Sequence, residues 1–188
     1  MKDDESMLSV CVFCGARSGD AAIYGSAAGQ LAEYLAANGH RLVYGGGSTG
    51  VMGQLADSML AQGGHVIGVI TTQLAQPELM HVHVPDMRIM ADMHQRKAVM
   101  HELSDAYVAL PGGLGTMEEF FEAVTWAQLE LHSRPIAMLN INGLYNGLVE
   151  LLDTMKQCGF LSSRCRSLVT VCQSVDELCG WLEQIRVP

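Results

Sequence analysis

Short apolar segments rich in β-branched residues alternate with helix-length segments from one end of the chain to the other. This alternation constrains the fold strongly, because continuous apolar strands separated by helices form a parallel sheet covered on both faces. The predicted strands span residues 8–14, 41–44, 65–70, 106–110, 136–140 and 168–172. The predicted helices span residues 21–37, 51–62, 91–103, 111–132 (counting the opening turn), 144–158 and 175–185. The expected fold class is α/β, a doubly wound parallel sheet in a Rossmann-like three-layer sandwich.

The 188 residues suit a single domain, residues 1–188, in which we expect residues 1–7 to form a flexible N-terminus. Residues 71–90 are predicted to be irregular because Pro77 and Pro85 interrupt them. Hydrophobic residues make up 49% of the chain, enough for one well-buried core. Charged residues make up only 16%, against about 25% in a typical domain, which indicates buried helix faces or a subunit interface.

Charge and hydropathy exclude several classes of partner. The formal net charge of -9 argues against nucleic acid, whose phosphates require a basic surface. No segment approaches the ~20 apolar residues that span a bilayer, so no membrane partner is expected. The acidic residues 3–5 do not fit the positively charged start of a signal peptide, so we expect a cytoplasmic protein.

The cysteines and histidines indicate neither redox nor metal chemistry. Cys11 and Cys14 have the C-x-x-C spacing but lie in a predicted buried strand, whereas a reactive pair needs a helix N-terminus. His81 and His83 would share a face in an extended segment, yet the sequence offers no convincing third ligand. We therefore predict no metal and no cofactor.

Two predicted strand-to-helix turns are rich in glycine. Residues 45–53 read G-G-G-S-T-G-V-M-G and residues 111–116 read P-G-G-L-G-T. Glycines at such turns let backbone N–H groups approach an anion, and the N-terminus of the following helix adds a favourable dipole. One such turn is equally well explained by tight packing of helix on strand, but two at the same sheet edge favour a phosphate-bearing ligand. The candidate ligand-binding residues of these turns are Gly46, Gly47, Ser48, Gly112, Gly113, Gly115 and Thr116.

The common nucleotide-binding motifs do not match these turns. A Walker A loop ends in Gly-Lys-Ser/Thr, and neither turn contains a lysine. A dinucleotide-binding fingerprint follows the first strand and is completed by an acidic residue after the second, where this chain has Tyr44 and Gly45. The sequence therefore argues against NAD binding and ATP hydrolysis.

Four charged residues accompany the turns. Glu118 and Glu119 are expected in the first turn of the helix that follows residue 111, where carboxylates commonly serve as caps. A carboxylate aimed at a phosphate pocket is also suited to stabilising an oxocarbenium-like sugar. Arg96 and Lys97 either form a solvated helix face or bind a phosphate or carboxylate.

Three segments of this chain occur together in one known family. They are Y-G-G-G-S-T-G-V-M-G at 44–53, D-M-H-Q-R-K-A at 92–98 and P-G-G-L-G-T-M-E-E at 111–119. The sequence resembles the LOG ("lonely guy") family of cytokinin riboside 5′-monophosphate phosphoribohydrolases, long labelled lysine decarboxylases. The similarity extends to residues 11–15, 65–70 and 125–129, and so covers nearly the whole chain.

The resemblance implies hydrolysis of the N-glycosidic bond of a nucleoside 5′-monophosphate to free base and ribose 5-phosphate, in a homodimer with its site near the subunit interface. It implies that Arg96 and Glu119 form the catalytic pair. The positions that match nucleotide-contacting residues are Glu78, Arg96, Lys97, Gly112, Gly113, Leu114, Gly115, Thr116, Met117, Glu118 and Thr125. Leu114 stands where plant members often have an aromatic residue, which leaves the base open: prenylated adenine, as in cytokinins, or the plain adenine of AMP.

Two other functions are open at this stage. A nucleotide or pterin carrier would bind phosphate through similar glycine loops without turnover. A pyridoxal-dependent decarboxylase would need a Schiff-base lysine, for which the chain offers only Lys2, Lys97 and Lys156.

Overall fold

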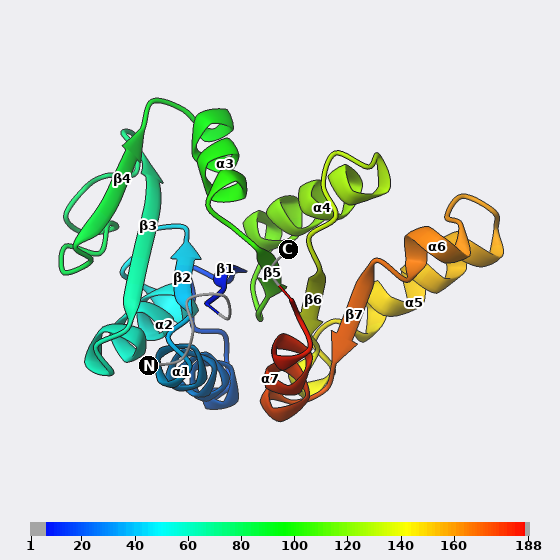
Figure 1. Cartoon of the computed structure of the whole chain (residues 1–188), viewed down its shortest axis with the longest axis horizontal. Coiled ribbons are helices and arrows are strands. Elements are labelled where there is room, and N and C mark those ends of the chain that lie inside the picture. The colour runs from blue at the N-terminus through cyan, green and yellow to red at the C-terminus, as the bar shows by residue number, and fades with distance from the viewer. Residues whose placement is uncertain (1–6, 187–188) are drawn as a thin grey trace.

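A computed structural model describes residues 7–186, which share one seven-stranded sheet (Figure 1). Every strand pairing is parallel, and the strand order is β4-β3-β2-β1-β5-β6-β7. The strands are β1 (Ser9–Phe13), β2 (Arg41–Tyr44), β3 (His65–Thr71), β4 (Asp86–Met90), β5 (Ala106–Ala109), β6 (Ile136–Leu139) and β7 (Val169–Cys172). The helices are α1 (Ala22–Ala37), α2 (Gly50–Ala61), α3 (Met93–Glu102), α4 (Leu114–Gln128), η2 (Ile141–Gly143), α5 (Asn146–Gln157), α6 (Ser163–Arg166) and α7 (Val175–Glu183). The predicted doubly wound α/β fold is confirmed.

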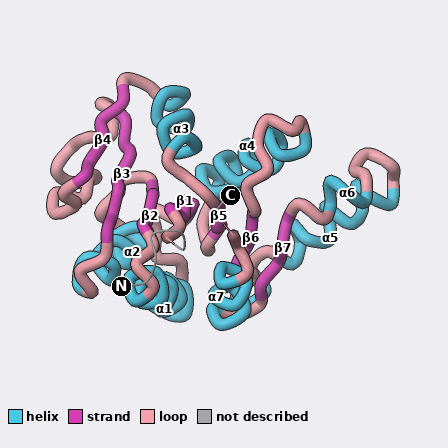
Figure 2. The backbone as a smooth tube through the Cα atoms, viewed as in Figure 1, coloured by secondary structure: helices cyan, strands magenta, loops and turns pink. Residues whose placement is uncertain are grey.

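The chain reverses its direction of travel across the sheet beside β1. Strands β2, β3 and β4 are added on one side of β1, and β5, β6 and β7 on the other, as Figure 2 shows. Val12 of β1 is in register with Tyr44 of β2 and with Val108 of β5. The loops that follow these three strands therefore leave the same edge of the sheet at its switch point, where ligands bind in open α/β folds.

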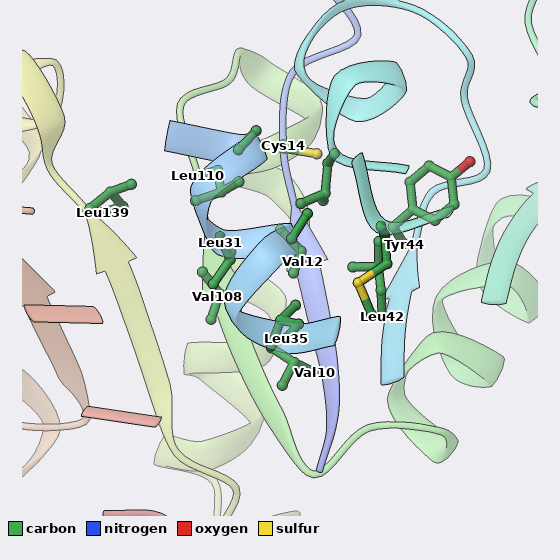
Figure 3. Packing of buried hydrophobic residues seen from close by; sticks show 14 of the residues in the cluster. Val10, Val12, Cys14, Leu31, Leu35, Leu42, Tyr44, Val108, Leu110 and Leu139 are labelled. Atoms are coloured by element: carbon green, nitrogen blue, oxygen red, sulfur yellow. The ribbon is translucent and has the colours of Figure 1, made fainter. Parts of the chain in front are cut away.

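Helices cover both faces of the sheet and bury a separate apolar cluster on each. On one face, Val10 and Val12 of β1 pack with helices α1, α2 and α7, and Figure 3 shows Leu31 and Leu35 of α1 over these strands. On the other face, Cys11 of β1 packs with residues of α3 and α4. Because side chains of a strand alternate between faces, residues three apart in β1 point in opposite directions.

This alternation settles the arrangement of the C-x-x-C pair. Cys11 belongs to the cluster under α3 and α4, and Cys14 to the cluster under α1 and α2. Both are buried, free thiols, and burial raises the pKa of each thiol. The prediction that these cysteines are structural agrees with their placement.

The structure corrects three expectations. The predicted irregular segment 71–90 contains the edge strand β4, which the pattern missed because its residues are mostly half-buried and include Asp86 and Arg88. The short helix α6 was also not predicted. Helix α4 begins at Leu114, so Glu118 and Glu119 lie in its second turn and not in the first.

The expectations about the N-terminus and about membrane spans can be compared with the structure only over residues 7–186. Apart from Met7, the predicted flexible terminus 1–7 lies outside them. Among residues 7–186, no helix combines the length and apolar character needed to cross a membrane.

Candidate active site

A pocket with a volume of about 580 Å³ opens at the carboxyl ends of the central strands. Three loops line it: the β1–α1 loop with residues 14–20, the β2–α2 loop with Gly45, Gly47 and Thr49, and the β5–α4 loop with Pro111, Gly112, Gly113, Gly115 and Thr116. Both glycine-rich turns predicted from the sequence therefore contribute to the same pocket. Strand order places the β5–α4 loop on one side of the β1–α1 loop and the β2–α2 loop on the other.

Backbone hydrogen bonds fix these loops against one another. The Gly15 amide donates to the Pro111 carbonyl (3.1 Å), and the Met52 amide donates to the Gly15 carbonyl (3.1 Å). The Thr49 hydroxyl donates to the Ala16 carbonyl (3.0 Å). Gly50 has a φ of +65°, and a side chain there would collide with the backbone of Ala16, so glycine is required for this contact.

The β5–α4 loop provides hydrogen-bond donors suited to an anion. Gly113 is the N-cap of α4 and supplies no side-chain cap. The first amides of α4 consequently have no partner within the helix and carry its positive dipole. Gly112, Gly113, Gly115 and Thr116 all line the pocket, and a helix end of this kind is suited to an anionic group.

Arg96 and Glu119 form a buried ion pair at the pocket wall. Arg96 Nη1 donates to Glu119 Oε1 at 2.7 Å, and the two side chains are only 9% and 12% exposed. Burial raises the pKa of the Glu119 carboxyl, while the adjacent guanidinium opposes that rise. A carboxylate held in this way is poised to gain a proton during a reaction.

The Arg96 guanidinium is held on several sides. Its Nε donates to the Val69 carbonyl at the end of β3 (2.8 Å), and Nη1 also approaches the Met93 sulfur (3.2 Å). Its Nη2 lies against Gly45, where any side chain would overlap it. Among the described residues Nη2 has no hydrogen-bond partner, so this group is available to a ligand.

Lys97 points away from the pocket and joins α3 to α4. Its Nζ donates to carboxylate oxygens of Glu118 and of Glu122 (2.9 Å). Burial lowers the pKa of the Lys97 ammonium, but these two carboxylates outweigh it and the net shift is upward. His101, one turn further along α3, lies 3.4 Å from the other Glu122 oxygen. The arrangement forms a polar clamp between the two helices beside the Arg96–Glu119 pair.

The predicted site residues therefore separate into two groups. Those that line the pocket are Gly47, Arg96, Gly112, Gly113, Gly115, Thr116 and Glu119. Those outside its lining are Gly46, Ser48, Glu78, Lys97, Leu114, Met117, Glu118 and Thr125. Of the second group, Gly46 and Ser48 bind the segment before β4: the His81 amide donates to the Gly46 carbonyl, and the Ser48 amide donates to the Leu79 carbonyl (2.8 Å). Leu114 is 91% exposed, and Glu78 and Thr125 are also on the surface.

Sequence reasoning missed two parts of the pocket. One is the β1–α1 loop, which contributes the charged residues Arg17 and Asp20. Its position after the first strand, at the switch point of the sheet, was the signal that could have identified it. The other is a group of apolar side chains, Met52, Ile70, Leu74 and Leu79, which we call the apolar wall. Leu74 and Leu79 come from the segment predicted to be irregular.

The fold and site define a Rossmann-like protein with a glycine-lined pocket at the switch point of its sheet and a buried carboxylate–guanidinium pair in the pocket wall. A family model described as "possible lysine decarboxylase" matches residues 52–182. A probable cytokinin riboside 5′-monophosphate phosphoribohydrolase of Oryza sativa subsp. japonica (LOGL1) is 44% identical over 175 residues, covering 93% of this chain and 78% of its own. The Arabidopsis thaliana cytokinin riboside 5′-monophosphate phosphoribohydrolase LOG1 is 42% identical over 183 residues, covering 97% and 86%. The chain belongs to this family, the LOG family.

Solved structures of more distant proteins share the fold. The molybdenum cofactor carrier protein from Chlamydomonas reinhardtii superposes with a TM-score of 0.69 at 21% identity, over 95% of this chain and 96% of that chain. The molybdenum cofactor binding protein from Rippkaea orientalis gives a TM-score of 0.68 at 19% identity, over 94% and 96%. At this identity the likeness concerns the fold alone.

Proposed function

We propose that this protein is a cytokinin riboside 5′-monophosphate phosphoribohydrolase, which hydrolyses the N-glycosidic bond and releases free base and ribose 5-phosphate. The observation that carries the proposal is the buried Arg96–Glu119 pair, 2.7 Å apart, in a pocket that the N-terminus of α4 supplies with anion-binding amides. The named activity of relatives at 42–45% identity supports it.

In the proposed mechanism, the amides of Gly112, Gly113, Gly115 and Thr116 bind the 5′-phosphate. The bond between ribose C1′ and the base nitrogen breaks, its electron pair leaves with the base, and Glu119 stabilises the positive charge at C1′. A water oxygen then bonds to C1′. One proton of that water passes to Glu119 and on to solvent.

Arg96 Nη2 has no protein partner among residues 7–186 and would donate to a ribose hydroxyl. Its Nη1 keeps Glu119 ionised through the ion pair, against the effect of burial on the carboxyl pKa.

The leaving base must gain a proton, and Glu118 and Glu78 are the two carboxyl groups to consider as donors. Glu118 is 56% exposed and paired with Lys97, and Glu78 is on the surface; neither lines the pocket. We therefore propose that water protonates the base. A large loss of turnover in Glu118→Gln would contradict this step.

The apolar wall supports a base with an apolar substituent. Its residues belong to the end of β3, to the segment after it and to α2, across the β1–α1 loop from the proposed phosphate site. A phosphate at α4 would place ribose near Glu119 and direct the base toward this wall. A prenyl group on the base gains free energy by burial there, about 25 cal/mol per Å² of apolar surface, so we propose that prenylated adenine nucleotides are preferred over AMP.

Neither alternative function is favoured. The carrier interpretation leaves the buried Arg96–Glu119 pair without a role. The decarboxylase interpretation lacks a Schiff-base lysine, because no lysine among residues 7–186 lines the pocket and Lys97 is bound by two glutamates. The family model's description is therefore not supported by the chemistry of this pocket.

The decisive experiment is release of free base, measured by chromatography, from AMP, N6-isopentenyladenosine monophosphate and the two unphosphorylated nucleosides. We expect release from the monophosphates only. Glu119→Gln should lower kcat by about 10²-fold or more with little change in nucleotide binding. Glu150→Gln, an exposed glutamate of α5, is the matched control and should retain wild-type turnover. Tight nucleotide binding without release from any substrate would favour a carrier instead.

We also propose a cytoplasmic homodimer. Several large apolar side chains are exposed on and around α4, including Leu114 (91%), Leu129 (61%) and Leu131 (66%), which a second subunit would cover. The six cysteines are all free, as is usual for proteins of a reducing compartment. Light scattering coupled to size exclusion tests the dimer, and cell fractionation tests the location.

A further inference from the structure

Two arginines line the pocket, and only one of them has a partner. Arg96 is paired with Glu119 at 2.7 Å, so its charge is largely balanced by the protein. Arg17, in the β1–α1 loop, has neither an ion pair nor a side-chain hydrogen bond with any residue in the range 7–186. The same loop contributes Asp20, likewise without an ion-pair partner in that range. The pocket thus holds one guanidinium whose role the Arg96–Glu119 chemistry does not explain.

The backbone that carries Arg17 is held in place. The carbonyl of Gly15 accepts from the Met52 amide, and the carbonyl of Ala16 accepts from the Thr49 hydroxyl (3.0 Å). On the opposite side, the Gly15 amide donates to the Pro111 carbonyl, the residue that opens the proposed phosphate loop. The Arg17 side chain therefore extends from a fixed point next to the N-terminus of α4, because β1 and β5 are neighbours in the sheet.

Charge balance gives this arginine a function. A phosphate monoester carries roughly 1.5 to 2 negative charges near neutral pH, whereas a helix N-terminus presents about half a positive charge. The chain as a whole has a net charge of -9, and the Glu119 carboxylate repels a phosphate placed close to it. A dianion in this pocket needs a cation on the side away from Glu119, and a guanidinium forms the paired hydrogen bonds that a phosphate accepts.

We propose that Arg17 is the cation that recognises the 5′-phosphate and makes the enzyme select nucleoside monophosphates over unphosphorylated nucleosides. The inference rests on the proposed function for the identity of the ligand. The two pocket arginines then have different roles: Arg17 binds the phosphate, whereas Arg96 pairs with Glu119 and donates to a ribose hydroxyl.

The test compares ligands with and without phosphate in Arg17→Met, Arg17→Lys and wild type. Binding of ribose 5-phosphate and of adenosine is measured by calorimetry, and KM and kcat are measured for AMP. We expect Arg17→Met to weaken ribose 5-phosphate binding and to raise KM for AMP by about 10- to 100-fold, the range for a charge-assisted hydrogen bond. Affinity for adenosine and kcat for AMP should change little, and Arg17→Lys should recover part of the affinity for ribose 5-phosphate.

Arg164→Met is the matched control, since it removes one exposed arginine of α6 and changes the net charge equally. It should bind ribose 5-phosphate within about twofold of wild type. Thermal unfolding of each variant checks the fold. Wild-type affinity for ribose 5-phosphate in Arg17→Met would overturn the inference, as would equal losses of affinity for ribose 5-phosphate and for adenosine.

The inference and the proposed reaction fail in different ways. If wild type releases no base yet binds ribose 5-phosphate through Arg17, the reaction is wrong and the role of Arg17 stands. If wild type hydrolyses AMP and Arg17→Met does so with unchanged KM, the reaction stands and the role of Arg17 is wrong. If wild type binds neither ribose 5-phosphate nor any monophosphate, both are wrong.

Discussion

Replacing Gly45 by alanine tests whether the position of Arg96 governs activity. The backbone at Gly45 is not in the left-handed region, so alanine introduces no backbone strain. Its methyl group would overlap Arg96 Nη2 and lie 3.2 Å from the Met52 sulfur. To restore an ordinary contact the guanidinium must withdraw by about 1 Å, and a displacement of that size in a catalytic constellation costs about 10²-fold in rate. We expect kcat/KM to fall by about that factor.

The pH dependence of Gly45→Ala identifies the cause of this loss. The guanidinium opposes the rise that burial causes in the Glu119 pKa, so its withdrawal should move the acid limb of the activity profile to higher pH. A methyl group that only obstructed the ligand would raise KM and leave the acid limb where it is.

A second glycine provides the control for Gly45→Ala. Gly29, in α1, has open space except for the Ser58 hydroxyl at 3.5 Å, so Gly29→Ala should keep full activity and gain about 0.5–1 kcal/mol of stability. Base release and urea unfolding measure the two quantities. If Gly45→Ala retained activity within about threefold of wild type, our account of the Arg96 position would be refuted.

Three further results are expected. Burial raises the pKa of Glu119, so wild-type activity should fall on acidification with a midpoint above the ordinary carboxyl value of 4.5; a midpoint at or below that value would contradict an essential buried carboxylate. Burial lowers the pKa of His101, so the stability that this residue contributes is present above the unfolded-state pKa of 6.5 and is lost as the pH falls below 6.5. Urea unfolding measured across that pH range should show this loss of stability, and the loss should be smaller in His101→Gln. Burial raises the pKa of the Cys11 and Cys14 thiols, whereas Cys158 is exposed. A thiol reagent should therefore modify Cys158 in the native protein, and Cys11 and Cys14 only after unfolding. Rapid labelling of Cys11 in the native protein would contradict this expectation and show that the sheet opens.

The parts of the fold that could be predicted are those with a strong local signal. Buried strands such as β3 read as continuous apolar runs, because both of their faces are covered. The edge strand β4 lacks that signal, since its mixed segment becomes a strand only by pairing with β3. Local pattern also misplaced the start of α4, which we expected at residue 111 and which lies at Leu114, because Gly113 caps the helix without a side chain.

The candidate site shows the same division. The two glycine-rich turns could be predicted because the physical demand for glycine is local to each turn. The ion pairs of Lys97 could not be predicted in this way. They depend on the packing of α3 against α4, which brings Glu118 and Glu122 to the Lys97 ammonium group. The residue pattern alone does not distinguish Arg96 from Lys97 as an anion-binding residue. Adjacent residues of a helix point about 100° apart, however, and of these two only Arg96 lines the pocket.

By itself, the sequence determined that this chain forms a parallel α/β sheet with two glycine-rich turns at one edge, because apolar periodicity and the demand for glycine act within a few residues. Only the tertiary structure decided which charges meet. It paired Arg96 with Glu119, 23 positions apart in the chain, and left Arg17 open to the pocket. It also brought the segment before β4 over the β2–α2 loop to form the apolar wall. Such contacts join residues that no local pattern connects, so they depend on strand order and helix packing.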